Sequence, residues 1–203
     1  MKSMFKDACI LFAITVIAGL LLGGVYQITK DPIAAQEELA KANACREVFA
    51  DAADFEQDPL FEADGSTPVY NMLYPNDSID NCQRALSAGG ELLGYVLTVT
   101  SHEGYGGDIK FMMGIRNDGT LNGISLLSIS ETAGLGMQAG EVLVPQFAGK
   151  NQIEFTYTKD GATSDSEIDA ISGATITTNA VTNGVNAGLS YFYSILSPEE
   201  GGE

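Results

Sequence analysis

Residues 169–178 read Asp-Ala-Ile-Ser-Gly-Ala-Thr-Ile-Thr-Thr, and an amphipathic helical pattern follows them. The stretch predicts a turn from a strand into a helix, with the hydroxyl of Thr175 at the turn. Gly173 and the small residue after it let the backbone approach a bulky anion, and the free N–H groups of the helix start favour that anion. Thr175 is therefore a candidate anchor for a phosphate. The alternative is an ordinary helix start, which Thr177 or Thr178 would cap.

The same stretch resembles the D-x-x-S/T-G-A-T signature of the FMN-binding domain shared by the RnfG component of the Rnf electron-transport complex and the NqrC component of the sodium-pumping NADH:quinone reductase. In that family the last threonine carries FMN through a phosphoester bond, which a dedicated flavin transferase installs from FAD. The resemblance makes Thr175 the acceptor of a covalent FMN. The other residues that match the signature are Asp169, Ser172, Gly173 and Ala174. Ala170 stands where glycine is common, and another small residue should leave the turn intact.

Two glycine-rich segments extend the resemblance. Residues 104–107 (GYGG) and 131–136 (ETAGLG) each predict no more than a loop when taken alone. Together they resemble a G-Y-x-G and an E-T-P-G-L-G motif of the same family, which pack around the isoalloxazine ring. Ala133 replaces the usual proline, and Ile129 stands where a histidine often precedes the motif. The resemblance implies ring contacts from Tyr105, Thr132 and Leu135, a cofactor site that includes Gly106, Glu131 and Gly134, and hydrogen bonds to the phosphate from Ser172 and Thr178.

Residues 8–25 contain no charged side chain and are long enough to cross a bilayer as a helix. A retained anchor is expected, and a cleavable signal peptide is the alternative, although no A-x-A-like cleavage site follows closely. Lys2 and Lys6 precede the span and Lys30 follows it, which favours a cytoplasmic N-terminus and an acidic domain outside the cell membrane. The G-x-x-x-G at residues 19–23 either packs against a partner subunit or reflects the frequency of glycine in spans.

A proline marks the expected end of the span. Asp31 and Pro32 are predicted to stop the first helix and to begin a connecting helix over about residues 33–55. The expected organisation is a tail and transmembrane anchor at 1–30, a connecting helix at 31–58 and an FMN-binding domain at 59–203.

The hydrophobic pattern after Pro59 shortens toward the alternation of strands. Strands are expected over 69–74, 91–101, 108–116, 121–129 and 153–158, with helices over 141–147 and 179–196. Asn-Asp-Gly at 117–119 predicts a hairpin turn, so the sheet should be antiparallel and the fold class α+β. One stripe of the last helix is expected in the core rather than at a cofactor: Val181, Val185, Leu189, Phe192 and Leu196.

The composition excludes several classes of function. The formal net charge is −17, and such a surface repels nucleic acid. The three cysteines form no C-x-x-C pair and the chain has one histidine, His102, so neither an iron–sulfur cluster nor a structural zinc site has its ligands. Cys45 and Cys82 either form a disulfide or remain separate thiols. The sequence contains no G-x-S-x-G, which favours a redox subunit over a stand-alone enzyme.

The resemblance implies an electron carrier that relays electrons within an Rnf-type ferredoxin:NAD oxidoreductase coupled to Na⁺ or H⁺ transport. Its partners would be the other membrane and redox subunits, the flavin transferase and the lipid bilayer. Three alternatives stay open: a membrane-anchored binding or assembly module without flavin, an NqrC-like component of a sodium-pumping NADH:quinone reductase, and a flavin-linked reductase of a small extracytoplasmic substrate.

Overall fold

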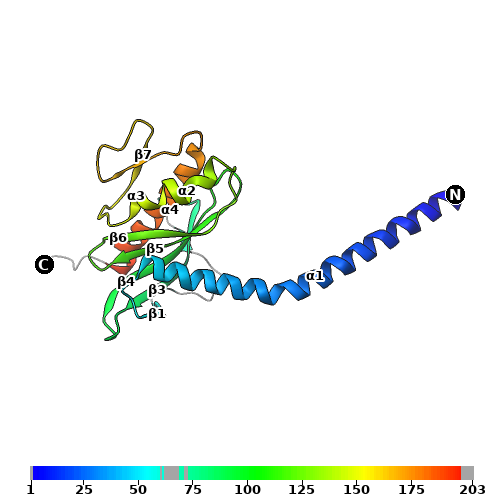
Figure 1. Ribbon diagram of the computed structural model, residues 1–203, viewed down its shortest axis with the longest axis horizontal. Coiled ribbons are helices and arrows are strands. Elements are labelled where there is room, and N and C mark those ends of the chain that lie inside the picture. Colours follow the sequence, from blue (N-terminus) through cyan, green and yellow to red (C-terminus); the bar gives the residue numbers. More distant parts are fainter. Residues whose placement is uncertain (1, 60, 62–68, 71–72, 198–203) are drawn as a thin grey trace. The chain divides into compact units, whose positions relative to one another are not determined.

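A computed structural model of the chain describes residues 2–59, 61, 69–70 and 73–197 (Figure 1). It divides into two compact units, Met1–Ala40 and Lys41–Glu203. The first unit is the larger part of helix α1 (Lys2–Val48), and the second is the folded domain.

Helix α1 continues through the position where a break was predicted, because Pro32 lies inside it. A proline removes one intrahelical hydrogen bond and strains the preceding turn, at a local cost of about 3 kcal/mol. Helical residues on both sides of Pro32 outweigh that cost. In the described part of the chain, α1 is the helix that is long and apolar enough to cross a membrane, by length and composition. The hydroxyl of Thr15, inside the apolar segment, donates to the carbonyl of Phe12 at 2.9 Å, so its polar group is satisfied within the helix.

The predicted connecting helix to residue 55 is too long. Helix α1 ends at Val48, and β1 (Asp54–Gln57) follows it. Strand β1 pairs with the end of β3 (Asp77–Leu86), in a register that sets Asp54 opposite Leu86. The sheet edge offers these residues backbone partners that the sequence pattern alone cannot reveal.

The domain is built on an antiparallel sheet in the order β1-β3-β4-β5-β6, with β2 (Val69–Tyr70) also paired to β3. Strands β4 (Leu92–Ser101), β5 (Ile109–Arg116) and β6 (Leu121–Ser128) lie within one residue of their predicted bounds. Gly119 has a φ of +83° in the predicted hairpin turn between β5 and β6. Strand β3 was not predicted, because its polar residues interrupt the hydrophobic pattern. Of the predicted strand at 69–74, residues 71–72 lie outside the described residues.

Helices and a small second sheet follow the main sheet. The helix predicted over 141–147 is divided into α2 (Ala139–Val142) and α3 (Val144–Phe147), after a 3-10 turn η1 (Gly136–Gln138). Strands β7 (Thr156–Thr158) and β8 (Glu167–Asp169) pair in parallel, so the strand predicted over 153–158 is shorter than expected. Helix α4 (Thr175–Tyr191) begins four residues earlier than predicted and continues into a π-helical turn, η2 (Phe192–Leu196).

Each face of the main sheet carries its own hydrophobic core. The main core lies between the sheet and α4, which packs on β3, β4 and β5 (Figure 1). The predicted stripe of α4 and η2 is buried in it, in full agreement with the sequence pattern. The outer core lies on the opposite face, where Ala44, Cys45 and Val48 at the end of α1 pack with Val96 and Met112. These contacts make the fold α+β, as predicted.

The two domain cysteines lie in different cores. Cys45 belongs to the outer core and Cys82 to the main core, and both are free thiols. Burial raises the pKa of both thiols, which keeps them protonated and unreactive. The sheet lies between the two side chains, and no disulfide joins them in this structure.

Candidate functional site

The predicted acceptor turn, residues 170–174, joins β8 to α4. The N–H of Ala174 donates to the carbonyl of Ile171 at 3.0 Å, and Gly173 between them has a φ of +77°. A side chain at this position would be strained, so glycine sets the shape of the turn. Thr175 follows as the first residue of α4.

The start of α4 leaves backbone donors unused. Ala174 is the N-cap residue, and no side chain of the described residues caps the helix. The first intrahelical donor is the N–H of Thr178, which binds the carbonyl of Ala174 at 3.0 Å. The N–H groups of Thr175, Ile176 and Thr177 therefore remain for a ligand, and the positive end of the helix dipole favours an anionic one. The alternative that Thr177 or Thr178 caps the helix is wrong, since both lie inside it.

Glu131 connects the two glycine-rich loops. Its Oε1 accepts a hydrogen bond from the N–H of Gly106 at 3.3 Å. A Cβ atom on Gly104 would lie 2.9 Å from the same oxygen, and one on Gly106 would collide with the carbonyl oxygen of Ser130. Both glycines are thus required for the close approach of the loops.

The second loop also packs directly on the acceptor turn. A Cβ atom on Gly136 would collide with the hydroxyl of Thr177 and lie 2.8 Å from the Cβ of Glu131. A Cβ atom on Gly173 would lie 3.1 Å from Cδ2 of Leu135. The three motifs that are separate in sequence therefore form one continuous surface.

That surface encloses a cavity of about 510 Å³, within the range of roughly 300–1,000 Å³ that small-molecule sites occupy. Its lining comes from all three motifs: Tyr105, Glu131, Thr132, Leu135, Gly136, Gly173, Ala174, Thr175, Ile176 and Thr177. Three of its large side chains are solvent-exposed, namely Tyr105 (71%), Ile176 (51%) and Leu135 (39%). Exposed apolar side chains around a concave site are typical of a ligand surface.

The structure brings together seven of the predicted site residues in this lining and leaves five outside it. The seven are Tyr105, Glu131, Thr132, Leu135, Gly173, Ala174 and Thr175; the five are Gly106, Gly134, Asp169, Ser172 and Thr178. Sequence reasoning missed Gly136, Ile176 and Thr177. Gly136 is the last residue of the segment 131–136, and Ile176 and Thr177 directly follow Thr175. Their position next to predicted site residues is the one sequence signal that could have identified them.

Thr178 was expected to bind the phosphate, and the structure gives it another role. Its side chain is fully buried, and its hydroxyl donates to the carbonyl of Ala174 at 3.0 Å. The same hydroxyl accepts the N–H of Ile171 at 3.1 Å. One buried group thus joins the end of the strand segment to the first turn of α4, and it holds the acceptor turn rather than the ligand.

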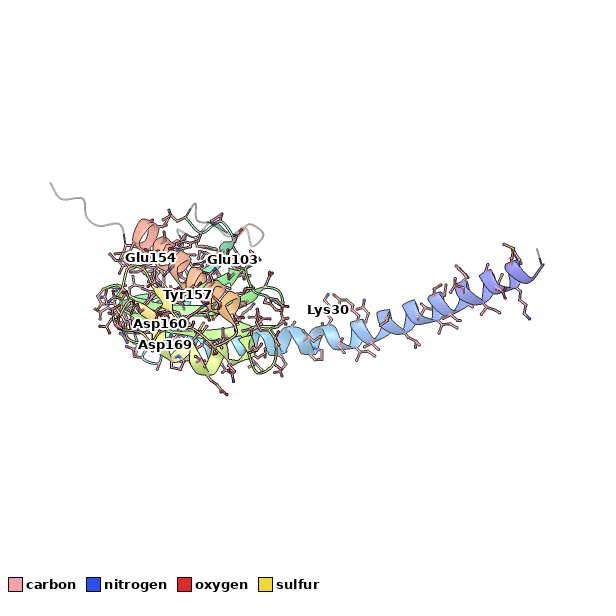
Figure 2. The ribbon with its side chains drawn as sticks, turned by 90° about the horizontal axis from the view of Figure 1, so that it is seen from above. Lys30, Glu103, Glu154, Tyr157, Asp160 and Asp169 are labelled. Carbon is pink, nitrogen blue, oxygen red and sulfur yellow. The ribbon has the colours of Figure 1, made fainter. Side chains whose placement is uncertain are left out.

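Asp169 likewise supports the site from outside. Its carboxylate accepts the N–H of Ala162, in the loop after β7 where Asp160 also lies (Figure 2). Its backbone N–H and carbonyl both bind the side-chain amide of Gln146, at 2.7 Å and 3.1 Å. These contacts fix the direction in which the chain enters the acceptor turn.

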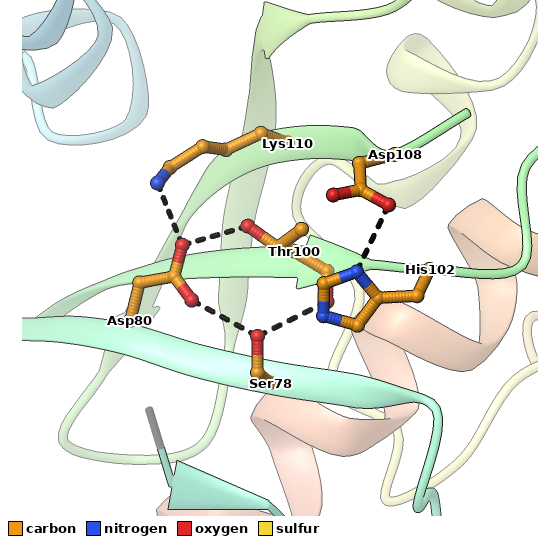
Figure 3. A network of polar contacts seen from close by, with 6 residues as sticks. All are labelled: Ser78, Asp80, Thr100, His102, Asp108 and Lys110. Atoms are coloured by element: carbon orange, nitrogen blue, oxygen red, sulfur yellow. Dashed lines mark hydrogen bonds and ion pairs between the residues drawn. The ribbon is translucent and has the colours of Figure 1, made fainter. Parts of the chain in front are cut away.

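A second hollow, of about 340 Å³, lies on the outer face of the main sheet and is polar (Figure 3). Asp80 is its centre: it accepts hydrogen bonds from Ser78 (2.9 Å) and Thr100 (2.7 Å) and pairs with Lys110 (2.6 Å). His102 lies here, with Nδ1 2.9 Å from a carboxylate oxygen of Asp108. The single histidine therefore does not belong to the cavity lining.

The cavity matches the chemistry of FMN. Unused N–H groups and a hydroxyl at one end suit a phosphate, and an apolar wall at the other suits an aromatic ring system. Residues 104–190 match the sequence model of the FMN-binding domain, a range that includes every residue of the cavity lining. The fold and cavity thus define an FMN-binding domain that follows a helix of membrane-spanning length.

Comparison over the full length identifies the family. Residues 1–48 match the model of the RnfG N-terminal region. The chain is similar to a subunit of the Na⁺-translocating ferredoxin:NAD⁺ oxidoreductase complex of Acetobacterium woodii, with 32% identity over 96% of this chain and 94% of that protein. It is also similar to a subunit of the proton-translocating ferredoxin:NAD⁺ oxidoreductase complex of Clostridium ljungdahlii, with 32% identity over 89% of this chain and 90% of that protein. The chain belongs to the RnfG family of Rnf complex subunits.

Among solved structures, NqrC of Shewanella oneidensis matches 73% of this chain and 68% of its own, with 15% sequence identity and a TM-score of 0.47.

Proposed function

We propose that this protein is a membrane-anchored electron carrier whose FMN is esterified through its phosphate to Thr175. One observation carries the proposal: the hydroxyl-bearing residue lines the cavity at the point where the unused N–H groups of α4 meet both glycine-rich loops. A covalent link at the phosphate end leaves the redox-active ring free of bonds to the protein.

The acceptor turn and the start of α4 have different roles in the attachment of FMN. The N–H groups of Ile176 and Thr177 stabilise the phosphate charge, and Gly173 removes any side chain that would block its approach. In the transfer from FAD, the Thr175 Oγ forms a bond to the FMN phosphorus and the bond from that phosphorus to the AMP phosphate breaks. AMP leaves, and the hydroxyl proton passes to solvent.

The two loops position the ring and limit its access to water. Tyr105, Leu135 and Ile176 supply apolar area, and Thr132 supplies a hydroxyl at the same wall. FMN supplies the ability to accept and donate electrons, and the protein sets its position and local charge. Glu131 connects the two loops through the N–H of Gly106, which fixes the wall that they form around the cavity.

The curated relatives suggest where the electrons go. Both are named as subunits of ferredoxin:NAD⁺ oxidoreductase complexes, one translocating Na⁺ and the other protons. We infer that this chain serves a complex of the same kind. Helix α1 anchors it in the cell membrane with the N-terminus in the cytoplasm, and the FMN-binding domain lies on the extracytoplasmic side. Its partners are the other membrane and redox subunits and the flavin transferase.

The test is direct detection of the modification. The full chain is co-expressed with an active flavin transferase, and the denaturing gel is viewed under ultraviolet light before staining. A fluorescent band is expected for the wild type and for Thr175→Ser, which keeps a hydroxyl, and no band for Thr175→Ala. Intact-mass analysis should show the added FMN, and mass analysis of a protease digest should place it on the peptide that contains Thr175.

The same gel decides between the carrier and an unmodified assembly module. A dark wild-type band, obtained with a transferase that modifies a known acceptor in the same cells, would exclude the covalent carrier. A fluorescent band that persists in Thr175→Ala would move the attachment to another residue.

A further inference from the structure

Two buried polar atoms face the same point of the main core. Asp77 and Ser101 lie opposite each other at the paired ends of β3 and β4. Asp77 is 1% exposed and Ser101 is 0% exposed. Within the described part of the chain, neither Asp77 Oδ1 nor Ser101 Oγ has a hydrogen-bond partner. Such atoms are rare in folded proteins, and a buried carboxylate oxygen without a partner favours the protonated form of the group.

The surroundings of Asp77 disfavour its negative charge. Helix α4 crosses above it, and a Cβ atom on Gly184 would lie 3.6 Å from Asp77 Oδ1. The titratable side chains that face it are Glu103 and His102 after β4, and Tyr74 before β3; Glu154 accepts the hydroxyl of Tyr74 at 2.9 Å. In this part of α4, Asn183 and Asn186 contribute amides and no charge.

Burial raises the pKa of Asp77 to about 6, and the negative charge of Glu103 acts in the same direction. The hydroxyl of Ser101 and the imidazole of His102 lower the pKa of Asp77, but by less than burial raises it. The Ser101 hydroxyl can accept the O–H of a protonated Asp77 and can donate to its ionised carboxylate, so the proton on Asp77 can bind and leave without depriving either side chain of a partner.

The residues next to Asp77 and Ser101 in the chain lead to the cavity. Glu103, which is labelled in Figure 2, accepts hydrogen bonds from the side-chain amides of Asn76 (2.9 Å) and Asn183 (2.7 Å). The next residue, Gly104, packs against the carboxylate of Glu131, which lines the cavity. Tyr105 is four positions after Ser101, so their Cα atoms are at most about 14 Å apart. Charges interact measurably over this distance in a protein domain.

We propose that Asp77 is a proton-binding site linked to the cavity: it takes up a proton from solvent when a reduced electron-transfer protein adds negative charge there, and releases it when that charge leaves. The link to the cavity depends on the flavin carrier proposed above, and the proton site itself does not. The added electron is balanced in part by the bound proton, so the interior of an already acidic domain gains less net charge.

The first experiment tests the proton site in the full chain, in detergent and without flavin. Unfolding by urea is measured from pH 4 to pH 8 for the wild type, Asp77→Asn and the control Asp80→Asn. Asp77→Asn keeps the shape of the side chain and cannot ionise. An unfolded aspartate ionises near pH 4 and Asp77 in the folded protein near pH 6, so the wild type should lose stability relative to Asp77→Asn between these values.

The expected loss is up to about 100-fold in the folding equilibrium constant, with a plateau above about pH 7. Asp80→Asn should lose stability over the same pH range as the wild type, because it keeps Asp77 and changes a side chain on the other face that is paired with Lys110. A difference between the wild type and Asp77→Asn that stays constant with pH would overturn the proton site.

The second experiment tests the link to the cavity in flavin-loaded protein. The reduction potential of the bound flavin is measured against pH for the same three proteins. The wild type and Asp80→Asn should share a bend near pH 6 that Asp77→Asn lacks. Coincident curves for the wild type and Asp77→Asn would overturn the link. An unmodified Thr175 would instead refute the covalent carrier and leave the first experiment to decide the proton site.

Discussion

The cavity and the polar hollow are both lined by hydroxyl groups, and they differ in what those groups have left to bind. In the hollow, the hydroxyls of Ser78 and Thr100 donate to Asp80, whose charge is paired with Lys110 (Figure 3). In the cavity, the first N–H groups of α4 have no intrahelical partner, and the described residues show no hydrogen bond from the Thr175 hydroxyl.

This difference distinguishes a ligand site from a structural network. A buried or half-buried polar group that is already satisfied gains little from a ligand, because the ligand must replace an existing hydrogen bond. A helix start without a capping side chain gains a full interaction. Volume alone does not distinguish the cavity from the hollow, since each is large enough for a small molecule.

The largest expected effect is the difference between removing the hydroxyl of Thr175 in the cavity and removing that of Thr100 in the hollow. Thr175→Ala should remove all covalent flavin, while Thr100→Val, which removes a hydroxyl from the hollow, should leave the ratio of flavin to folded protein unchanged. The measurement is absorbance of the flavin against protein after denaturation. Loss of flavin from folded Thr100→Val would mean that the hollow takes part in the modification.

The next effect comes from the close contact of the second loop with α4. Gly136→Ala places a methyl group against Thr177 and Glu131, so we expect a loss of about 1–3 kcal/mol in the free energy of unfolding and less covalent flavin. Gly140→Ala, four residues later, meets only Leu126 at 3.7 Å and should stay within about 1 kcal/mol of the wild type. Equal behaviour of the two variants would contradict the packing described for the cavity wall.

A similar loss of stability, with a smaller effect on the flavin, is expected at the buried hydroxyl that holds the acceptor turn. Thr178→Val leaves the N–H of Ile171 without its partner, which should cost about 1–3 kcal/mol and slow flavin attachment to Thr175. Thr178→Ser keeps the hydroxyl and should restore the attachment rate. If serine fails to rescue a folded protein, the methyl group rather than the hydroxyl supports the turn.

The smallest effect should come from the hollow. Lys110 and Asp80 are both partly exposed, and ion pairs of this kind contribute about 0–1 kcal/mol. Lys110→Met should therefore change the unfolding free energy by about 1 kcal/mol or less and leave the flavin content unaltered. A larger change, measured by urea unfolding, would show that the network supports the domain more strongly than its exposure indicates.

Prediction succeeded where a single segment carries its own signal. Strand β4 carries apolar side chains on alternate positions, and the hairpin turn between β5 and β6 contains a glycine at positive φ. Prediction failed at β1 and β3, because their pairing depends on partners distant in the chain. It also failed at Pro32, where the helical segments on both sides outweigh one lost hydrogen bond.

The sequence by itself predicted the acceptor, the two glycine-rich loops and the apolar helix, because each is a local pattern of residue types with a local physical reason. Only the tertiary structure decided that the loops and the acceptor turn enclose one cavity, that Thr178 holds the turn, and that Asp77 is buried beside Ser101. These outcomes depend on which distant segments approach each other and on which hydrogen bonds they leave unmade.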